Sequence, residues 1–314
     1  MNKTLLEYIW LDGNSTQTLR SKLKTVDWID KPQVKPSNLP TWNFDGSSTK
    51  QAEGSYSECN LKPVRVYAWT DYHYFVLCEV MNPDGTPHKS NTRARLSPLA
   101  SRYEESNYWW GFEQEFFLTK DDRIAGFPTN GYPPAQGPYY CGVGTGRVAG
   151  RKLSEKHLVK CLRMGIDLTG TNAEVAIGQW EYQCFSEDTL KACDDLWMSR
   201  YVLSRLGEDY GFGINLDPKP VSGDWNGSGC HTNFSNSWIR NTNSKEKVFS
   251  LMETFKTNHG VHIENYGEEN HLRLTGDHET QHIDTFSWGV GDRGASYEFI
   301  ASHLYSSSTV SIDF

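Results

Sequence analysis

The chain has 314 residues, room for one large domain or two ordinary ones, and its 37% hydrophobic and 22% charged residues are typical of a globular protein. A net charge of −8 with dispersed Lys and Arg argues against a nucleic-acid-binding surface, and no apolar run approaches the roughly 18 residues of a membrane-spanning helix. The seven cysteines form no C-x-x-C pair and the N-terminus lacks a signal-peptide pattern, so we expect a cytoplasmic protein with reduced thiols.

Residues 1–95 are predicted to form a small β-rich domain. Its predicted strands are residues 5–10, 64–69 and 74–80. The sequence NPDG at residues 82–85 is typical of a turn, and residues 31–40 carry three prolines and are predicted to connect two elements. The stretch WNFDGSST at residues 42–49 also has the composition of a turn.

Residues 96–314 are predicted to form a larger domain of strands and helices. The predicted helices are residues 154–164, 187–210 and 245–259. Ser186 is the expected N-cap of the second helix, and Gly165 and Gly211 are expected to end the first two. The apolar stripe expected on the first helix is Leu158, Cys161 and Leu162. Because strands and helices interleave without βαβ regularity, the predicted class is α+β, with an antiparallel sheet and helices in the larger domain.

The segment FEQEF at residues 112–116 is the clearest chemical signal. It lies in a predicted strand, residues 112–118, in which successive side chains point to opposite faces. Glu113 and Glu115 therefore share one face, while the residues on either side of them face the other way. Two neighbouring carboxylates repel each other unless a cation lies between them.

A second acidic segment, NAEVAIGQWE, covers residues 172–181. Glu174 and Glu181 are separated by a turn at Gly178, so two short strands would bring them together. Four carboxylates beside apolar neighbours suggest a site for Mg²⁺ or Mn²⁺, which prefer oxygen ligands. For any single pair of carboxylates, an exposed strand face is the competing interpretation.

Three loops add candidate ligand-binding residues. The glycine-rich stretch at residues 142–150 lacks the spacing of a P-loop or a dinucleotide fingerprint, so a flexible loop is the simpler interpretation. The sequence GDWNGSGCHTN, residues 223–233, places Asn226 and His231 in a loop that a ligand can approach closely. In RLTGDHET, residues 273–280, an arginine fork suits a substrate carboxylate and a glutamate suits a base.

Taken together, these motifs resemble eukaryotic-type (type II) glutamine synthetase. In chain order they are WNFDGSST, CEV, FEQEF, NGYPPAQGPYYCGVG, NAEV, GQWEYQ, DPKP, GDWNGSGCHTN, YG, RLTGDHET and FSWGVGDRGAS, from Trp42 to Ser296. The resemblance implies a β-grasp-like domain over residues 1–95 and a catalytic domain over residues 96–314. It also implies a homo-oligomer, usually a decamer of two pentameric rings, with active sites between neighbouring subunits.

The resemblance also implies a reaction and its participants. ATP phosphorylates glutamate to γ-glutamyl phosphate, and ammonia, supplied as ammonium, then displaces phosphate to give glutamine, with Mg²⁺ or Mn²⁺ on the phosphates. By resemblance, the ligands of one metal are Glu115, Glu174 and Glu181, and those of the second are Glu113 and His231. The substrate-binding residues implied are Asn226, Gly227, Arg273 and Ser48. The catalytic residues implied are Asp45, Glu279 and Arg293, and the nucleotide-binding residues are Trp109 and Arg293. Asp45 and Ser48 are implied to serve the neighbouring subunit's site.

The resemblance ends after RGAS. The family continues with I-R and later with E-D-R-R-P, whereas this sequence has Tyr297-Glu298 and ends in HLYSSSTVSIDF, without a helical pattern. We therefore expect a catalytic domain that lacks the usual C-terminal segment, and a lowered activity. Two alternatives stay open: a catalytically weak paralogue that acts in nucleotide binding or assembly, and a ligase for a different acid or amine.

Overall fold

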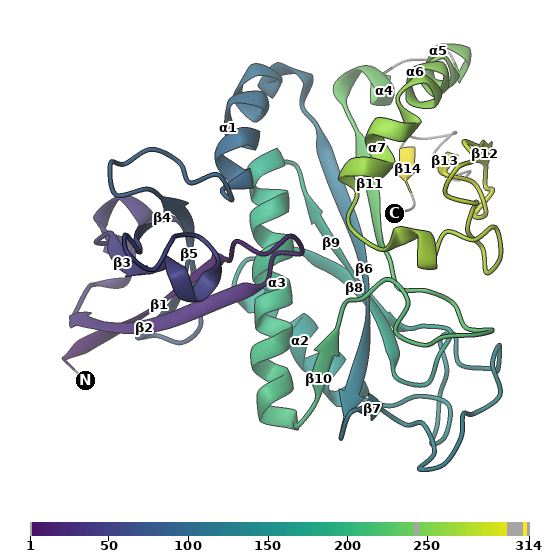
Figure 1. Cartoon of the computed structure of the whole chain (residues 1–314), viewed down its shortest axis with the longest axis horizontal. Helices are drawn as coiled ribbons and strands as arrows, with labels where there is room; N and C mark the ends of the chain where they lie inside the picture. Colours follow the sequence, from purple (N-terminus) through teal and green to yellow (C-terminus); the bar gives the residue numbers. More distant parts are fainter. Residues whose placement is uncertain (1, 242–244, 300–309, 313–314) are drawn as a thin grey trace. The chain divides into compact units, whose positions relative to one another are not determined.

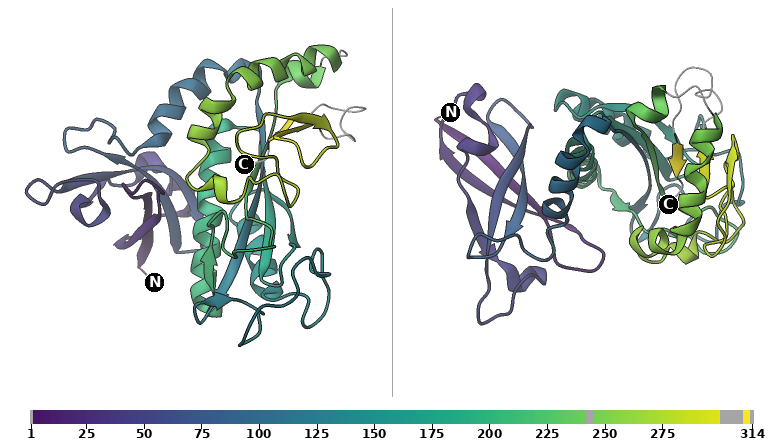
Figure 2. Two further views of the ribbon diagram at one scale, coloured as in Figure 1. Left: turned by 45° about the vertical axis from the view of Figure 1, so that its right-hand side comes forward. Right: turned by 90° about the horizontal axis from the view of Figure 1, so that it is seen from above.

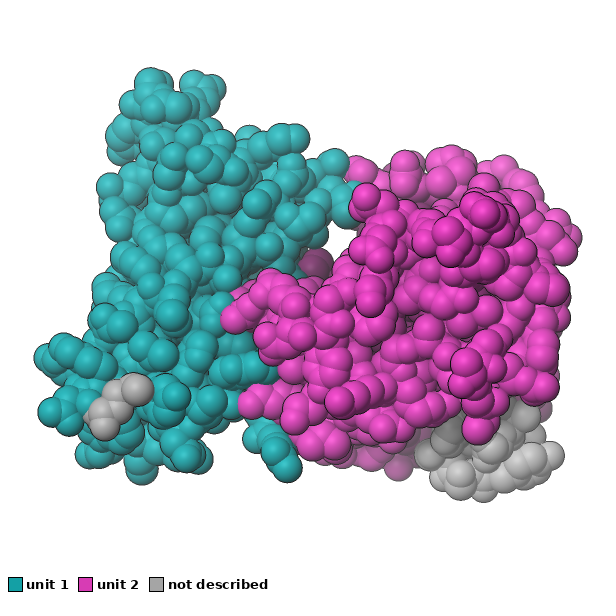
Figure 3. Space-filling model, turned by 90° about the horizontal axis from the view of Figure 1, so that it is seen from below, with its two compact units in different colours: residues 1–103, 163–165 teal, residues 104–162, 166–314 magenta. Residues whose placement is uncertain are grey.

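The computed structural model describes residues 2–241, 245–299 and 310–312. These residues form two compact units, unit 1 with residues 1–103 and 163–165 and unit 2 with residues 104–162 and 166–314 (Figure 3). The boundary predicted between residues 95 and 96 stays a prediction. The tail predicted to lack a helical pattern lies mostly outside the described residues, and its described residues 310–312 form a strand.

Unit 1 is built on a five-stranded sheet in the order β2-β1-β5-β4-β3 (Figure 1). Its strands are β1 (Lys3–Leu11), β2 (Leu19–Asp27), β3 (Trp42–Asp45), β4 (Glu58–Ala68) and β5 (His73–Met81). Strands β1 and β5 pair in parallel and the other neighbours are antiparallel. Leu6, Tyr8 and Val76 are fully buried in its core, because the apolar side chains of β1 and β5 alternate toward one face.

Most predictions for unit 1 are confirmed, but one strand was missed. The predicted strands correspond to β1, β4 and β5, and the NPDG turn is closed by a hydrogen bond from Gly85 N to Asn82 O of 2.9 Å. Strand β2 was not predicted, because its sequence has many basic and small residues and few large apolar ones. Its pairing with β1 is what makes it a strand. The proline-rich connector contains two 3₁₀ turns, η1 (Lys31–Gln33) and η2 (Pro36–Asn38).

Unit 1 also contains a 3₁₀ helix at the predicted turn and one helix that was not predicted. In the WNFDGSST stretch, the first four residues form β3 and the last four form the 3₁₀ helix η3 (Gly46–Thr49), capped by Asp45. Helix α1 (Thr92–Arg102) begins after Asn91, whose side chain accepts a hydrogen bond from Ala94 N.

Unit 2 is built on a nine-stranded sheet in which β6 is the longest strand. The order along the sheet is β12-β13-β14-β11-β6-β9-β8, and β7 and β10 also pair with β6. The strands are β6 (Trp109–Lys120), β7 (Arg123–Ile124), β8 (Leu168–Ala173), β9 (Gln179–Ser186), β10 (Gly213–Asn215), β11 (Cys230–Ser235), β12 (Trp288–Val290), β13 (Tyr297–Phe299) and β14 (Val310–Ile312). The mixture of helices with this largely antiparallel sheet confirms the predicted α+β class.

Two long helices belong to unit 2, and each corrects a detail of the prediction. In α2 (Arg151–Arg163) the buried residues include Leu153, His157 and Cys161, spaced four apart, whereas Leu162 is 48% exposed, so the predicted stripe was displaced by one residue. Helix α3 (Thr189–Tyr210) is capped by Asp188 and not by Ser186, because β9 continues through Ser186. Gly211 ends α3 in the left-handed conformation, as predicted.

Shorter helices complete unit 2: η4 (Glu104–Ser106), α4 (Ser237–Asn241), α5 (Lys245–Phe249), α6 (Leu251–Thr257), α7 (His259–Asn265) and η5 (Asn270–Leu272). The helix predicted over residues 245–259 is therefore wrong as one element. The Ser250 hydroxyl donates to Lys247 O at 2.6 Å, a local bond that competes with the helix ladder, and α5 ends there. Among the described residues, no helix is long and apolar enough to cross a membrane.

Candidate functional site

Strand β6 presents a different chemistry on each face. Its buried residues, among them Phe112, Gln114 and Phe116, alternate with the half-buried Glu113 and Glu115, as predicted. Helix α3 packs against the apolar face. There the Gln114 side-chain oxygen accepts a hydrogen bond of 2.8 Å from Nε of Arg200, a residue of α3. The carboxylates therefore face away from α3. Figure 2 shows the backbone of this unit from two further sides.

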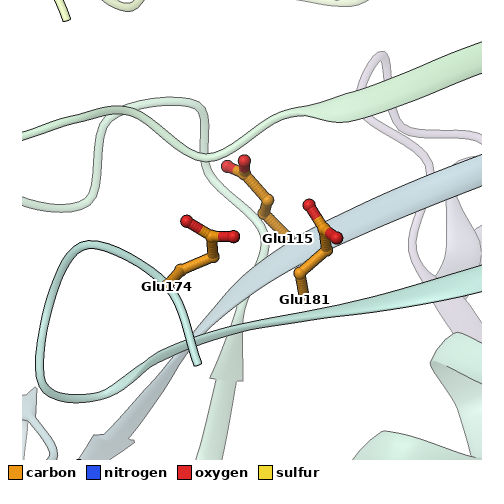
Figure 4. Close-up of side chains that lie close together, drawn as sticks. All are labelled: Glu115, Glu174 and Glu181. Carbon is orange, nitrogen blue, oxygen red and sulfur yellow. The ribbon is translucent and has the colours of Figure 1, made fainter. Parts of the chain in front are cut away.

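Three carboxylates from three segments converge on this face. Glu181 lies on β9 directly opposite Glu115 of β6, and Glu174 follows the end of β8. Two backbone hydrogen bonds close the turn between β8 and β9. Gln179 N donates to Ala176 O at 3.0 Å, and Glu174 N donates to Gln179 O at 2.9 Å. Glu174 therefore folds back toward Glu181. One oxygen of each carboxylate lies within 4.8 Å of the others (Figure 4). The structure thus brings Glu115, Glu174 and Glu181 together, and their role as metal ligands stays a prediction.

The electrostatics of this cluster fit a divalent cation. Burial, followed by the charge of Glu181, raises the pKa of Glu174 to about 8, and burial, followed by the charge of Glu113, raises the pKa of Glu181 to about 7. Burial and then Glu174 raise the pKa of Glu115 well above its ordinary range. Burial and the neighbouring negative charges thus oppose ionisation of all three carboxylates, and a bound cation would offset both effects. An all-oxygen donor set with three such carboxylates suits Mg²⁺ or Mn²⁺.

Hydrogen bonds hold the carboxylates in place, and most of their donors were missed from the sequence. Glu115 Oε2 accepts from Gly229 N at 2.8 Å. The Asn172 amide donates to Glu174 Oε1 at 2.9 Å, and the Gln183 amide donates to Glu181. Gln183 lies two residues from Glu181 on the same strand face, so strand alternation was the signal that could have found it.

Glu113 and His231 form a second, smaller group. They are direct register partners on β6 and β11, and the Asn233 amide donates to Glu113 Oε1 at 2.7 Å. Within the part of the chain that the structure describes, no third His, Cys, Asp or Glu joins this pair closely enough to complete a set of three ligands. The two residues meet as predicted, and their metal role stays a prediction.

Glu298 of β13 belongs to the surroundings of this pair. Glu298 is the register partner of Ser311 on β14, and Ser311 is the register partner of Asn233 on β11. Asn233 lies two residues from His231 on the same strand. Burial raises the pKa of Glu298, while His231 and Arg293 act in the opposite direction. The carboxylate thus adds negative charge close to Glu113.

The loop before β11 forms the next part of the site. Gly227 packs so closely on Arg273 that a Cβ atom there would lie 2.1 Å from Arg273 Cγ, and its carbonyl accepts from the Gln179 amide at 2.9 Å. Arg273 is only 6% exposed, and its charge acts on Glu115. Asn226 accepts a hydrogen bond of 2.8 Å from Gln136. The predicted substrate residues Asn226 and Gly227 are therefore consecutive in this loop, and Arg273, which follows η5, packs against Gly227.

Glu279 and Arg293 lie on exposed segments of unit 2. Glu279 has a positive φ of 62°, and its charge contributes to the raised pKa of Glu174. Burial alone would lower the pKa of Arg293, but Tyr140, Glu298 and Glu279 together raise it. Tyr140 was not predicted as a site residue. These interactions bring Glu279 and Arg293 to the border of the carboxylate cluster.

Two predicted site residues belong to unit 1. Asp45 and Ser48 are exposed at the end of β3 and in η3, and Asp45 accepts hydrogen bonds from the hydroxyls of Ser47 at 2.6 Å and Ser48 at 3.1 Å. This local cap explains their conformation. Their predicted role toward a neighbouring subunit stays a prediction.

A cavity of about 420 Å³ opens beside Glu113 at the start of β6. Its walls include the aromatic side chains Trp109, Phe185 and Phe234, and the guanidinium carbon of Arg240 lies 3.9 Å from the centre of the Trp109 ring. Trp109, predicted to lie beside a nucleotide, therefore lines an aromatic cavity adjacent to a carboxylate. Arg240 was not predicted as a site residue, because it is distant from Trp109 in the sequence and no local pattern connects the two.

Comparison with known protein families gives one match over more than half of the chain. Residues 89–253 match the family described as glutamine synthetase, catalytic domain. The matched residues include β6, β9 and β11, which carry Glu113, Glu115, Glu181 and His231, and the turn after β8, which carries Glu174.

Individual glutamine synthetases resemble the chain over most of its length. A glutamine synthetase of Bradyrhizobium diazoefficiens is 50% identical over 303 residues, covering 94% of this chain and 86% of the relative. One of Yarrowia lipolytica is 45% identical, covering 93% and 80%. A chloroplastic one of Zea mays is 43% identical, covering 94% and 70%. The similarity thus extends to bacterial, fungal and plant proteins.

A solved structure shares the fold. The cryo-EM structure of Plasmodium falciparum glutamine synthetase superposes with a TM-score of 0.76, covering 99% of this chain and 68% of that chain at 16% sequence identity. At this identity the match supports the fold alone.

Proposed function

The chain belongs to the glutamine synthetase family, and we propose that it is a glutamate–ammonia ligase that uses ATP to form glutamine through γ-glutamyl phosphate. The observation that carries this proposal is the convergence of Glu115, Glu174 and Glu181 on the face of β6 that lies beside an aromatic cavity. A carboxylate triad and a cavity large enough for a nucleobase are what a metal-dependent phosphoryl transfer requires.

Glu115, Glu174 and Glu181 would hold one divalent cation, and Glu113 with His231 would hold a second. Bound there, Mg²⁺ or Mn²⁺ would neutralise the phosphate oxygens of ATP as a Lewis acid. Trp109 offers an aromatic surface for the base, within reach of the carboxylates that face the phosphates. Arg293 remains a cation at all physiological pH values and suits the charge that develops on the transferred phosphoryl group.

Arg273 would clamp the α-carboxylate of glutamate. Because its side chain is buried, a salt bridge there is poorly screened by water and fixes orientation as well as charge. Gly227 and Asn226 would shape the same pocket, since a Cβ atom at Gly227 would displace the Arg273 side chain. The γ-carboxylate oxygen of the bound glutamate then attacks the γ-phosphorus of ATP, the bond to the bridging oxygen breaks, and ADP leaves.

Glu279 and Asp45 would act in the second half of the reaction. Ammonia attacks the acyl carbon of γ-glutamyl phosphate, phosphate leaves with the bonding electrons, and Glu279 takes the proton that the new amide nitrogen loses. Asp45, with Ser48 beside it, would bind the incoming ammonium at the site of the neighbouring subunit. We propose that the protein is cytoplasmic and forms a homo-oligomer, because a site shared between subunits requires an assembly. A decamer is the proposed form.

The shared site can be tested by mixing two inactive subunits. An Asp45→Ala chain and a Glu115→Ala chain, refolded together, should regain activity, because some interfaces then contain one intact site. Mixed rings verified by mass spectrometry that remain inactive would exclude a site shared in this way.

Glu298 favours one alternative, a catalytically weak member of the family that still binds nucleotide. It places a carboxylate near Glu113 and Arg293, where the family resemblance leads one to expect a cation, and negative charge there opposes phosphate binding. A hydroxylamine-dependent γ-glutamyl transfer assay, run beside a titration with Mn-ATP, separates the two functions. Transfer activity supports the ligase, while nucleotide binding without transfer supports the weak paralogue and overturns the ligase.

A further inference from the structure

Two side-chain amides connect the carboxylates of Glu174 and Glu181. The Gln183 amide nitrogen donates to Glu181 and also to Asn172 Oδ1, the latter at 2.8 Å. The Asn172 amide nitrogen in turn donates to Glu174 Oε1 at 2.9 Å. An unbroken series of hydrogen bonds thus runs from one carboxylate to the other through two neutral groups.

The sheet register places both amides on the face that carries the carboxylates. Asn172 of β8 is the direct partner of Glu181 on β9, and Gln183 lies opposite Gly170. A Cβ atom at residue 170 would lie 2.7 Å from the Gln183 side-chain oxygen, so the glycine leaves the space that this amide occupies. The β8–β9 register shifts between Leu168 and Gly170, next to the same position.

The chemistry of these donors matters for a cation site. An ammonium or guanidinium group would orient a carboxylate but would also neutralise it and compete with a metal ion. An amide N–H orients the oxygen and leaves the negative charge available. Asn172 and Gln183 therefore have the properties of groups that prepare two carboxylates to bind a cation.

We propose that Asn172 and Gln183 are positioning residues, which hold Glu174 and Glu181 in the arrangement that binds the divalent cation. This inference rests on the metal site of the proposed function and adds two residues to it. The competing explanation is that the amides only stabilise the β8–β9 hairpin. Cation affinity separates the two, because a hairpin contact contributes to folding stability without acting on the ligands.

The test is calorimetric titration of the full chain with Mn²⁺, without ATP, glutamate or ammonium. Gln183→Met keeps the length of the side chain and removes the donor, and Asn172→Ala removes the second amide at a partly exposed position. We expect each to weaken Mn²⁺ binding at the carboxylate cluster by about 10- to 100-fold, the usual effect of removing an outer hydrogen-bond partner of a metal ligand. Gln281→Met is the matched control, because its amide donates to Ser287 Oγ and not to a carboxylate.

A third variant guards against misfolding. Gly170→Ala leaves both amides and all three carboxylates in the sequence but crowds the Gln183 amide, so it should weaken Mn²⁺ binding in the same direction by a smaller factor. Circular dichroism and the melting temperature are measured for every variant. An affinity within about twofold of the unchanged chain in any folded variant of Gln183 or Asn172 would overturn the proposal.

The outcomes also distinguish this inference from the proposed function. If the wild-type chain binds Mn²⁺ but forms no glutamine, the ligase function is refuted, and Mn²⁺ binding by the variants still decides the positioning role. An unchanged chain that binds no Mn²⁺ would overturn the positioning role together with the metal half of the proposed function.

Discussion

The carboxylate cluster and the Glu113–His231 pair lie on the same face of β6, two residues apart, yet they differ in how many segments supply them. The cluster takes one residue from β6, one from β9 and one from the turn after β8. The pair takes one residue from each of two paired strands. Register alone brings two side chains together, whereas a third ligand needs a turn or another strand that folds back over them.

The two groups also differ in their electrostatic surroundings. Burial and then the charge of Glu181 raise the pKa of Glu174, burial and then the charge of Glu113 raise the pKa of Glu181, and neutral amides hold both carboxylates. Glu113 has an amide donor as well, but it also lies close to the carboxylate of Glu298. We therefore expect the cluster to bind a cation by itself, and the pair to depend on what surrounds it.

Substitution of the central carboxylate should have the largest effect. Glu115→Ala leaves two of the three oxygen ligands, and we expect glutamine formation to fall by roughly 10³-fold or more, with a loss of Mn²⁺ binding at the cluster. Activity and calorimetric stoichiometry are measured together. Unchanged affinity and stoichiometry in the folded variant would remove Glu115 from the ligand set.

Substitution of the pair should separate the two groups. His231→Ala is expected to lower the rate by about 10²- to 10³-fold, the usual cost of losing one electrostatic stabiliser, while Mn²⁺ binding at the cluster is retained. Electron paramagnetic resonance of bound Mn²⁺, with Glu115→Ala as the reciprocal control, shows which site is empty. Equal loss of both sites would mean that the cluster and the pair bind cations as one unit.

Reversing the charge of Glu298 should act in the opposite direction. Because its carboxylate adds negative charge near Glu113, Glu298→Arg is expected to raise the rate by about 10-fold, a change of 1.4 kcal/mol in the barrier. Glu298→Gln, which only removes the charge, is the control and should give a smaller gain. A lower rate in both folded variants would show that Glu298 contributes to the site.

The smallest effect concerns stability and pH. In the folded chain the pKa is about 8 for Glu174 and about 7 for Glu181, whereas the ordinary value is 4.5. Between these values the folded chain binds more protons than the unfolded chain. Without metal, the free energy of unfolding therefore decreases as pH rises from about 5 to 8. The melting temperature in a chelating buffer should fall through this window by roughly 2–4 °C for each 1 kcal/mol lost. Added Mn²⁺ should reverse the trend because it replaces the protons. Glu174→Gln should flatten the dependence, and a melting temperature that rises with pH without metal would contradict the raised pKa values.

Several elements were predictable because their signals are local. The alternation of Glu113 and Glu115 with apolar neighbours is a property of the strand itself, and Gly178 marks the turn that brings Glu174 to Glu181. The predicted end of α3 at Gly211 depends only on the conformational freedom of glycine.

Other features depend on residues that are distant in sequence. Ser186 has the chemistry of an N-cap, but pairing with Trp110 extends β9 through it, and Asp188 caps α3 instead. Strand β2 exists because β1 pairs with it, and the buried side of α2 is set by what packs there, one residue around the helix from the predicted stripe.

By itself the sequence determined the α+β class, the family, the acidic strand and the candidate ligands, because composition, alternation and ordered motifs can be recognised along one dimension. The tertiary structure decided which ligands come together. It places three carboxylates from three segments in one group and Glu113 with His231 in another. It also places the amides of Asn172 and Gln183 between Glu174 and Glu181. The physical reason is that a hydrogen bond or a shared cation depends on distances of a few ångströms, which the register between strands sets and the order of residues does not.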